Sequence, residues 1–186
     1  MSTPESAQKP LRRVRSFVRR PGRLTAAQRR ALTDLMPRYA ATGVDGRLEP
    51  AQLLGREAPC VLDIGFGDGE ALATSAINYP HVDYLGVEIH EPGIGHLLLL
   101  LEQAAVTNVR VVDRDAADVV LELPDASLAA VNLFFPDPWP KKRHHKRRLV
   151  QPAFLGDLAR VLRRGGLLHV ATDWADYARH TREVLE

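Results

Sequence analysis

The stretch that decides the fold is CVLDIGFGDGEALATSAINYPHVDYLGVE, residues 60–88. Residues 60–65 form an apolar run that predicts a buried strand, and the glycines after it predict a tight turn. Residues 70–78 are expected to form a helix, and residues 82–88 a second apolar strand. Strands that are apolar throughout and separated by a helix indicate a parallel sheet that is covered on both faces.

The same alternation continues to the end of the chain. Further strands are predicted at residues 109–112, 128–135 and 167–172, and further helices at residues 92–106, 116–121 and 152–164. Gly165-Gly166 is interpreted as the stop of the last of these helices. Upstream, Thr25-Ala-Ala-Gln28 predicts a capping box that opens a helix ended by Pro37, and residues 43–59 resemble a connector. The prediction is an α/β fold with a mostly parallel, doubly wound sheet.

Composition indicates one globular domain. The chain has 186 residues, of which 45% are hydrophobic and 26% charged. Its longest aliphatic run, Leu97–Leu101, is too short for a membrane span, and its polar N-terminus is no secretory signal. The single cysteine, Cys60, opens an apolar strand and is expected to be a buried hydrophobe. The single cysteine also suits a reducing compartment, so a cytoplasmic protein is expected. A monomer or weak homodimer is expected as well, although no feature of the sequence shows whether the chain dimerises.

Positive charge is concentrated in two windows. Residues 11–30 contain eight arginines and no acid, and residues 141–148 contain six Lys/Arg and two His, although the net charge is only +2. This distribution predicts a localised site for a polyanion, with a basic arm at residues 1–24 ahead of a domain at residues 25–186. The alternative is a solvated tail and a solvated loop.

A cofactor site is expected at the carboxyl ends of the strands, where such sheets bind ligands. The loop Gly65-Phe-Gly67-Asp-Gly69 has Glu70 where a dinucleotide fingerprint needs its third glycine, and its spacing resembles the loop of class I methyltransferases. Glu88 can then accept from both ribose hydroxyls of the cofactor, with a solvated strand-end carboxylate as the alternative. Asp115 can meet the adenine amino group; Asp113 is its competitor, but the alternation of the strand favours Asp115. The cofactor of class I methyltransferases is S-adenosyl-L-methionine. Asp63 could accept from the amino group of its methionine part or from the backbone amides of the glycine loop, and both roles remain open.

Residues 133–148 read LFFPDPWPKKRHHKRR and resemble the hallmark of the bacterial tRNA (guanine-N7-)-methyltransferase family. Further matches, from about residue 12 onward, are RSFVRR (15–20), DIGFG (63–67), GVEIH (86–90) and ATDW (171–174). The resemblance implies a class I, Rossmann-like methyltransferase fold and S-adenosyl-L-methionine as cofactor. It also implies methylation of guanine N7 in the variable loop of tRNA, which forms 7-methylguanosine.

The resemblance also assigns residues. Cofactor contacts fall on Asp63, Glu88, Asp115 and Asp137, and substrate contacts on Lys141 and Asp173. Gly65 and Gly67 are expected to bind the cofactor as part of the glycine loop. Family members usually have Glu where this chain has Asp63, so its contact can be direct, water-bridged or lost. The family's sheet has two more strands after the fifth. Because this sequence stops at Glu186, its C-terminal strands are expected to be missing and its activity is in question.

Asp137 is predicted to be the catalytic residue. Guanine N7 has a free lone pair at neutral pH, so its methylation needs alignment and charge stabilisation rather than a strong base. Phe135 and Asp137 each precede proline, which favours extended backbone and a rigidly presented carboxylate. The predicted role is to orient the guanine and offset its developing positive charge. A turn of purely structural purpose is the alternative.

The cations around Asp137 are expected to bind tRNA phosphates. They are Lys141, Lys142, Arg143, His144, His145, Lys146, Arg147 and Arg148. Trp139 could stack on an extruded base or pack beneath the loop. The arm, with Phe17 among its arginines, is expected to order on tRNA. No metal site is predicted. The rival functions are a nicotinamide-dependent oxidoreductase, disfavoured by Glu70, and a non-catalytic RNA-binding protein.

Overall fold

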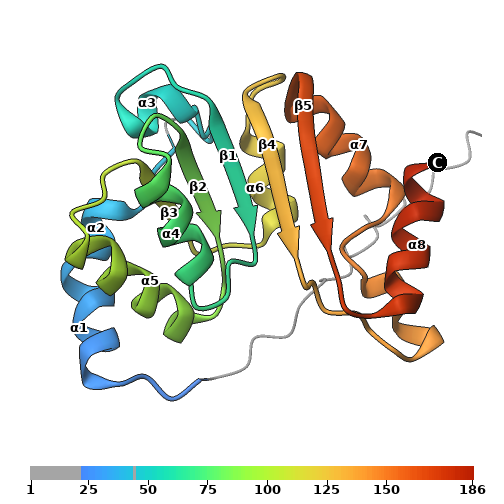
Figure 1. The fold of residues 1–186 in the computed structure, drawn as a ribbon, viewed down its shortest axis with the longest axis horizontal. Coiled ribbons are helices and arrows are strands. Elements are labelled where there is room, and N and C mark those ends of the chain that lie inside the picture. Colours follow the sequence, from blue (N-terminus) through green and yellow to red (C-terminus); the bar gives the residue numbers. More distant parts are fainter. Residues whose placement is uncertain (1–21, 44) are drawn as a thin grey trace, which may run out of the picture.

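Five parallel strands form the sheet of this chain. The computed structural model describes residues 22–43 and 45–186. Its strands are β1 (Cys60–Ile64), β2 (Asp83–Val87), β3 (Val109–Val112), β4 (Leu128–Phe134) and β5 (Leu162–Ala171). They pair in the order β3-β2-β1-β4-β5, all parallel, and the arrowheads visible in Figure 1 point to one end of the sheet. The predicted doubly wound parallel sheet is confirmed.

Helices cover both faces of this sheet. They are α1 (Ala26–Asp34), α2 (Met36–Tyr39), α3 (Pro50–Leu54), α4 (Glu70–Asn78), α5 (Glu91–Gln103), α6 (Ala116–Glu122), α7 (Pro152–Val161) and α8 (Ala175–Leu185), with the 3-10 helix η1 (Lys142–Arg147). On one face, α1, α2, α4 and α5 bury an apolar cluster that includes Tyr84 and Leu97. On the other, α6, α7 and α8 bury a cluster that includes Val120, Phe154 and Tyr177. Burial from both sides explains the continuous apolar runs of the inner strands.

The segment before the sheet is partly as predicted. The capping box at the start of α1 is present, since the Gln28 N–H donates to Thr25 Oγ1 (3.1 Å) and the Thr25 N–H donates to Gln28 Oε1 (2.9 Å). Pro37, however, does not end α1 but lies in the first turn of α2, where proline is tolerated. The expected connector contains α3, which ends at Gly55 with a left-handed φ of 74°. The prediction of an irregular connector is therefore wrong in its middle.

The start of β5 differs from the prediction. Helix α7 ends at Val161, and β5 begins at the next residue, where Leu162 pairs with Leu128. The register then shifts before Leu167 pairs with Ala130, and Gly165 in between has a φ of 76°. A left-handed glycine is the usual device for a β-bulge. Gly165-Gly166 therefore lies within a strand and does not stop a helix.

Candidate functional site

Acidic residues gather at one end of the sheet. Asp63 is near the end of β1, and the others follow the ends of β2, β3, β4 and β5: Glu88, Asp115, Asp137 and Asp173. Because all five strands are parallel, these ends share one edge. The sheet extends in opposite directions from β1 and β4, so the topological switch point lies between the strands that carry Asp63 and Asp137.

Glu88 joins the glycine loop to the end of β2. Its Oε2 accepts from the Gly67 N–H (3.0 Å), and its Oε1 accepts from the N–H groups of Ile89 (2.7 Å) and His90 (3.0 Å). A carboxylate has about four acceptor positions, so these bonds leave room for about one further donor. The free acceptor position is on Oε2, so a ribose that used both carboxylate oxygens would have to share or displace a contact of Oε1 with Ile89 or His90.

Two glycines that the sequence analysis did not single out allow α5 to pack closely on its neighbours, the glycine loop and α1. A Cβ at Gly93 would lie 1.9 Å from the carbonyl oxygen of Gly67, and a Cβ at Gly95 would lie 2.9 Å from Cβ of Gln28. Only glycine lets α5 begin directly against the loop and pack on α1. The available signal is Gly93-Ile94-Gly95 inside a helix, where each glycine costs about 1 kcal/mol relative to alanine.

Asp63 is a buried carboxylate. The residue is 6% exposed, and its Oδ2 accepts from the Nδ2 of Asn132 in β4 at 3.4 Å. Burial raises the pKa of Asp63 to about 6, and the Asn132 hydrogen bond acts in the opposite direction. An ionised carboxylate at this depth is costly unless donors or a cation face it. Asn132 is a further site residue, and its signal is a lone amide within the apolar strand LAAVNLF.

Asp115 is the N-cap residue of α6. Its Oδ1 accepts from the N–H of Ala117 at 3.0 Å, and its backbone is extended, with φ −60° and ψ 125°. This bond satisfies one of the amides that a helix start leaves without a partner. One carboxylate oxygen therefore serves the helix, and an adenine amino group would need the other.

Asp137 lies exposed in the turn between β4 and η1. Phe135 has a φ of 48° and Trp139 a φ of 45°, so both are left-handed. The prediction of extended backbone at Phe135 is therefore wrong. The Phe135 N–H donates to the Ala171 carbonyl (2.8 Å), which continues the β4–β5 pairing, and its side chain is 66% exposed. Left-handed backbone is unfavourable for residues with a Cβ and has to be held by its surroundings.

Trp139 contacts the basic segment, residues 141–148. The guanidinium of Arg147 lies 4.9 Å from the centroid of the Trp139 ring, and the His144 ring meets it edge-on at 5.8 Å. Of the two predicted roles, these contacts favour packing over stacking on a base. Desolvation, and then the charges of Arg143 and its neighbours, lower the pKa of His144, which favours its neutral form.

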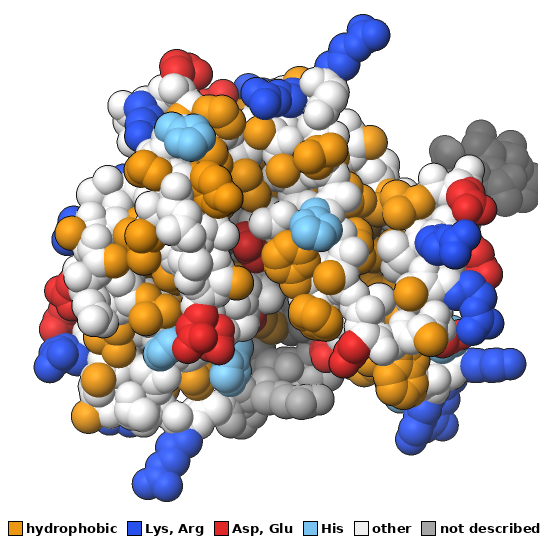
Figure 2. All heavy atoms as spheres, in the orientation of Figure 1, with side chains coloured by type: hydrophobic (Ala, Val, Ile, Leu, Met, Phe, Trp, Pro, Cys, Tyr) orange, Lys and Arg blue, Asp and Glu red, His pale blue; other side chains and the backbone are white. Residues whose placement is uncertain are grey.

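The cations of residues 141–148 do not all face solvent. Lys141, Lys142, Arg143 and Lys146 are exposed, and Figure 2 shows Lys and Arg side chains gathered at the lower right, where Figure 1 places η1. The Arg148 side chain, by contrast, is 1% exposed and forms an ion pair with Asp176 of α8. The prediction that Arg148 binds phosphate is therefore wrong, because a buried, paired guanidinium cannot reach a ligand.

Asp173 is exposed at the end of β5, and the next residue, Trp174, is the N-cap residue of α8 and 42% exposed. The structure therefore brings Asp173 to the same edge as Asp137. The predicted basic arm, residues 1–24, lies largely outside the described residues.

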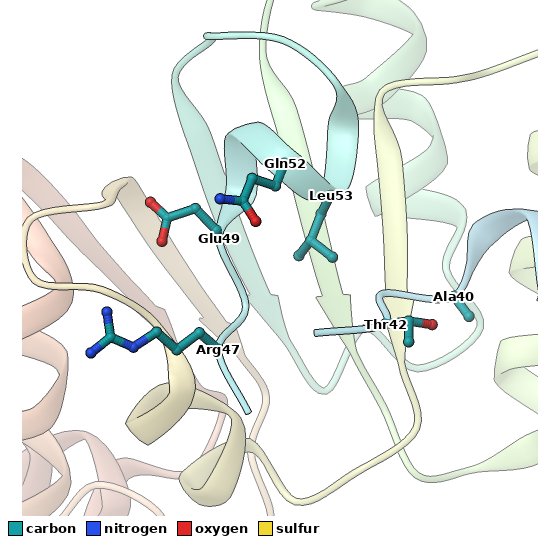
Figure 3. A pocket seen from close by; sticks show the side chains of 6 residues that line it. All are labelled: Ala40, Thr42, Arg47, Glu49, Gln52 and Leu53. Carbon is teal, nitrogen blue, oxygen red and sulfur yellow. The ribbon is translucent and has the colours of Figure 1, made fainter. Parts of the chain in front are cut away.

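A cavity of about 170 Å³ lies elsewhere, beside α3 (Figure 3). It is lined by Ala40, Thr42, Arg47, Glu49, Gln52 and Leu53. Because α3 precedes β1, this cavity is near the amino ends of the strands and contains none of the predicted site residues. Within residues 22–43 and 45–186, no three His, Cys, Asp or Glu residues are grouped as a metal site requires. No helix of that part is long and apolar enough to cross a membrane.

Solved structures that superpose on this chain include methyltransferases. An antibiotic-related methyltransferase superposes with a TM-score of 0.55 at 19% identity, over 79% of this chain and 76% of that chain. Precorrin-6y C5,15-methyltransferase from Geobacter metallireducens also has a TM-score of 0.55, at 17% identity, over 73% of this chain and 65% of that chain. Identities this low reflect fold alone. The chain therefore has a Rossmann-like methyltransferase fold.

Sequence comparison identifies the family to which this chain belongs. Residues 57–186 match the family described as "Putative methyltransferase". A tRNA (guanine-N(7)-)-methyltransferase of Halorhodospira halophila is 57% identical over 180 residues, which are 94% of this chain and 77% of that protein. Its counterpart in Alkalilimnicola ehrlichii is 55% identical over 178 residues, covering 94% of this chain and 75% of that protein. The chain belongs to the tRNA (guanine-N(7)-)-methyltransferase family, so the resemblance seen in the sequence is confirmed.

Proposed function

We propose that this chain transfers a methyl group from S-adenosyl-L-methionine to N7 of a guanine in the variable loop of tRNA, forming 7-methylguanosine. The proposal is carried by one observation. A methyltransferase fold places four acids at adjoining strand ends, namely Asp63, Glu88, Asp115 and Asp137. Relatives that are more than half identical to this chain are named for that reaction, which supports the choice of substrate.

The strand-end residues suit this cofactor. Asp63 is a buried carboxylate whose partner is the neutral amide of Asn132, so the cationic amino group of a methionine moiety would complement it. Glu88 offers a remaining acceptor position to a ribose, and Asp115 offers an acceptor to an adenine amino group. When bound, S-adenosylmethionine supplies an electrophilic methyl group on a sulfonium.

Asp137 is proposed to act on the guanine. N7 attacks with a lone pair and loses no proton, so the carboxylate serves to orient the base and to stabilise the positive charge that develops on it. That stabilisation is larger in the transition state than in the ground state. Asp137 is therefore proposed as a positioner and charge stabiliser rather than as a base.

The tRNA is proposed to lie over the same edge. Lys141, Arg143 and Lys146 are exposed and suited to phosphate contacts. Arg147 and His144 contact the Trp139 ring and are proposed to form part of the same surface. Asp173, from the adjoining strand, is proposed to contact the substrate from the other side. Residues 1–24 are proposed to add further phosphate contacts.

The test is methyl incorporation from labelled S-adenosylmethionine into unmodified bulk tRNA, followed by nucleoside analysis. The expected product is 7-methylguanosine. Asp137→Asn is expected to lower turnover on the order of 10²-fold or more, because charge stabilisation is lost, with tRNA affinity within a few-fold. Asp125→Asn is the matched control, since Asp125 is 78% exposed at the other end of β4.

The possible outcomes separate the alternatives. A chain that binds tRNA but transfers no methyl group would be the non-catalytic RNA-binding protein. Unchanged turnover in Asp137→Asn would leave the activity standing and remove the role of Asp137. Calorimetric titration with S-adenosylmethionine and with NAD(H) separates the methyltransferase from an oxidoreductase.

A further inference from the structure

Arg148 is a buried cation at the end of the basic segment. Its side chain is 1% exposed, whereas Lys141, Lys142 and Arg143 are on the surface. A guanidinium does not lose its proton in a protein, and burying a charge is costly unless partners surround it. The partners of Arg148 therefore indicate what this fold uses it for.

Those partners come from three parts of the chain. Nε donates to the carbonyl oxygen of Pro138 (3.0 Å), and Nη2 donates to Oδ2 of Asp176 (2.5 Å) and to Nε2 of His145 (3.2 Å). The guanidinium also lies 5.1 Å from the ring centroid of Tyr177. Pro138 belongs to the turn after β4, His145 to η1, and the other two residues to α8. The Arg148 side chain thus joins the turn after β4 to α8, the helix that follows the neighbouring strand β5.

Further bonds fix α8 to the same segment. The Val150 N–H donates to the Tyr177 hydroxyl (3.2 Å), and Nε2 of His180 bonds to the Val150 carbonyl (2.8 Å). Tyr177 is fully buried and stacks on His180, with 5.9 Å between the ring centroids. The first turns of α8 are therefore a rigid support, and they follow Asp173 directly in the chain.

We propose that Arg148 is a positioning residue for methyl transfer: it holds the Asp137 turn against α8 and so fixes Asp137 relative to Asp173. The kinetic consequence rests on the proposed function, whereas the link itself rests on geometry. Pro138, whose carbonyl accepts from Arg148, lies between Asp137 and Trp139. The left-handed φ of 45° at Trp139 is a conformation that needs such outside support.

The kinetic test is a double-mutant cycle of Arg148→Met with Asp137→Asn. With Asp137 present, Arg148→Met is expected to lower the single-turnover rate of methyl transfer roughly 100-fold, with affinities for bulk tRNA and S-adenosylmethionine within about three-fold. In the Asp137→Asn background, the same change is expected to cost less than about three-fold, because no carboxylate remains to be positioned. Arg163→Met, in the exposed amino-terminal part of β5, is the matched control.

Two kinetic results would overturn the proposal. One is an unchanged rate in Arg148→Met. The other is an equal loss in both backgrounds, because Arg148 would then act independently of Asp137. Asp176 is 47% exposed, so its carboxylate is solvated when its partner is removed, and Arg148→Met is expected to fold. If it does not fold, Arg148→Gln, which also removes the guanidinium and leaves no buried cation, is taken through the same cycle.

A second measurement does not depend on activity. The chain has two tryptophans, so Trp174→Phe leaves Trp139 as the sole fluorescent indole, inside the segment that Arg148 supports. Arg148→Met in this background is expected to lower the fluorescence anisotropy of Trp139, because the turn is released. Unchanged anisotropy overturns the proposal. A wild-type chain that transfers no methyl group would refute the proposed function, while the anisotropy would still decide the role of Arg148.

Discussion

The carboxyl group of Asp63 has its pKa raised from the ordinary 3.8 to about 6, mainly because burial disfavours its charged form. The folded chain therefore holds this proton more tightly than the unfolded chain does. Between about pH 4 and pH 6 the unfolded state loses the proton first, so stability falls as the pH rises through this window. The same burial prepares the site for a cationic ligand group, which would favour the ionised form.

Replacing Asp63 with Asn tests whether this carboxyl group lowers the stability of the protein as the pH rises. The amide cannot ionise, so Asp63→Asn is expected to gain roughly 2 kcal/mol in unfolding free energy relative to wild type between pH 4 and pH 7. Urea denaturation at several pH values measures the difference, with Asp125→Asn as the control for a surface carboxylate. A difference between the Asp63→Asn variant and wild type that does not vary with pH would contradict the raised pKa.

Single residues were predictable where local pattern decides their place. Asp63, Glu88 and Asp115 could be located because strand ends follow from apolar runs. Phe135 and Arg148 could not. The backbone N–H of Phe135 is hydrogen-bonded to the carbonyl of Ala171, and the buried Arg148 is ion-paired with Asp176. Both conformations therefore depend on segments far away in the sequence.

At the scale of elements, the N-cap residue of α6, Asp115, is proposed to have two tasks. Asp115 caps the helix through Ala117 and is also proposed to accept from the adenine of the cofactor. A cap is worth typically about 1 kcal/mol, and serine supplies it nearly as well as aspartate. The two tasks can therefore be separated by substitution.

Asp115→Ala is expected to lose about 1 kcal/mol of stability and also affinity for S-adenosylmethionine. Asp115→Ser is expected to keep the stability and still lose affinity, because its hydroxyl reaches the helix amide and is too short for the ligand. Chemical denaturation and calorimetric titration of both variants measure the two effects. Wild-type affinity in Asp115→Ser would rule out the proposed adenine contact.

Element bounds were predicted well for α4 and β3, whose ends at 70–78 and 109–112 agree with the structure. Their limits are set by local signals, such as glycine before a helix and an uninterrupted apolar run. The start of β5 was missed because it depends on the pairing of Leu162 with Leu128. Glycines that would stop a helix also permit a bulge, and only the partner strand decides between them.

At the scale of the molecule, charge is divided between regions. The net charge is only +2, yet residues 141–148 carry six Lys/Arg at the carboxyl end of β4. Four of these side chains, Lys141, Lys142, Arg143 and Lys146, are exposed. A polyanion attracted there would arrive at the edge where the acidic strand ends lie, so long-range attraction and the proposed chemistry coincide.

Salt dependence tests whether this charge is a local site. Replacing Lys142 and Arg143 by Gln is expected to reduce the slope of log affinity for tRNA against log salt by roughly 1.5, at about 0.7 to 0.9 for each phosphate that is no longer neutralised. Replacing Arg163 and Arg164, which are exposed at the start of β5, changes the net charge equally and is expected to leave the slope unaltered. Equal flattening in both variants would indicate a general charge effect instead.

The sequence by itself determined the class of fold, the edge of the sheet that carries the acids, and the family. These depend on periodicity, on glycine and proline positions and on a contiguous motif, all of which are local. Only the tertiary structure decided which charges are available to a ligand and which are structural. Arg147 and Arg148 are neighbours in one basic run, yet one packs against Trp139 and the other is buried against Asp176. That difference follows from burial, which depends on α8 packing beside the turn.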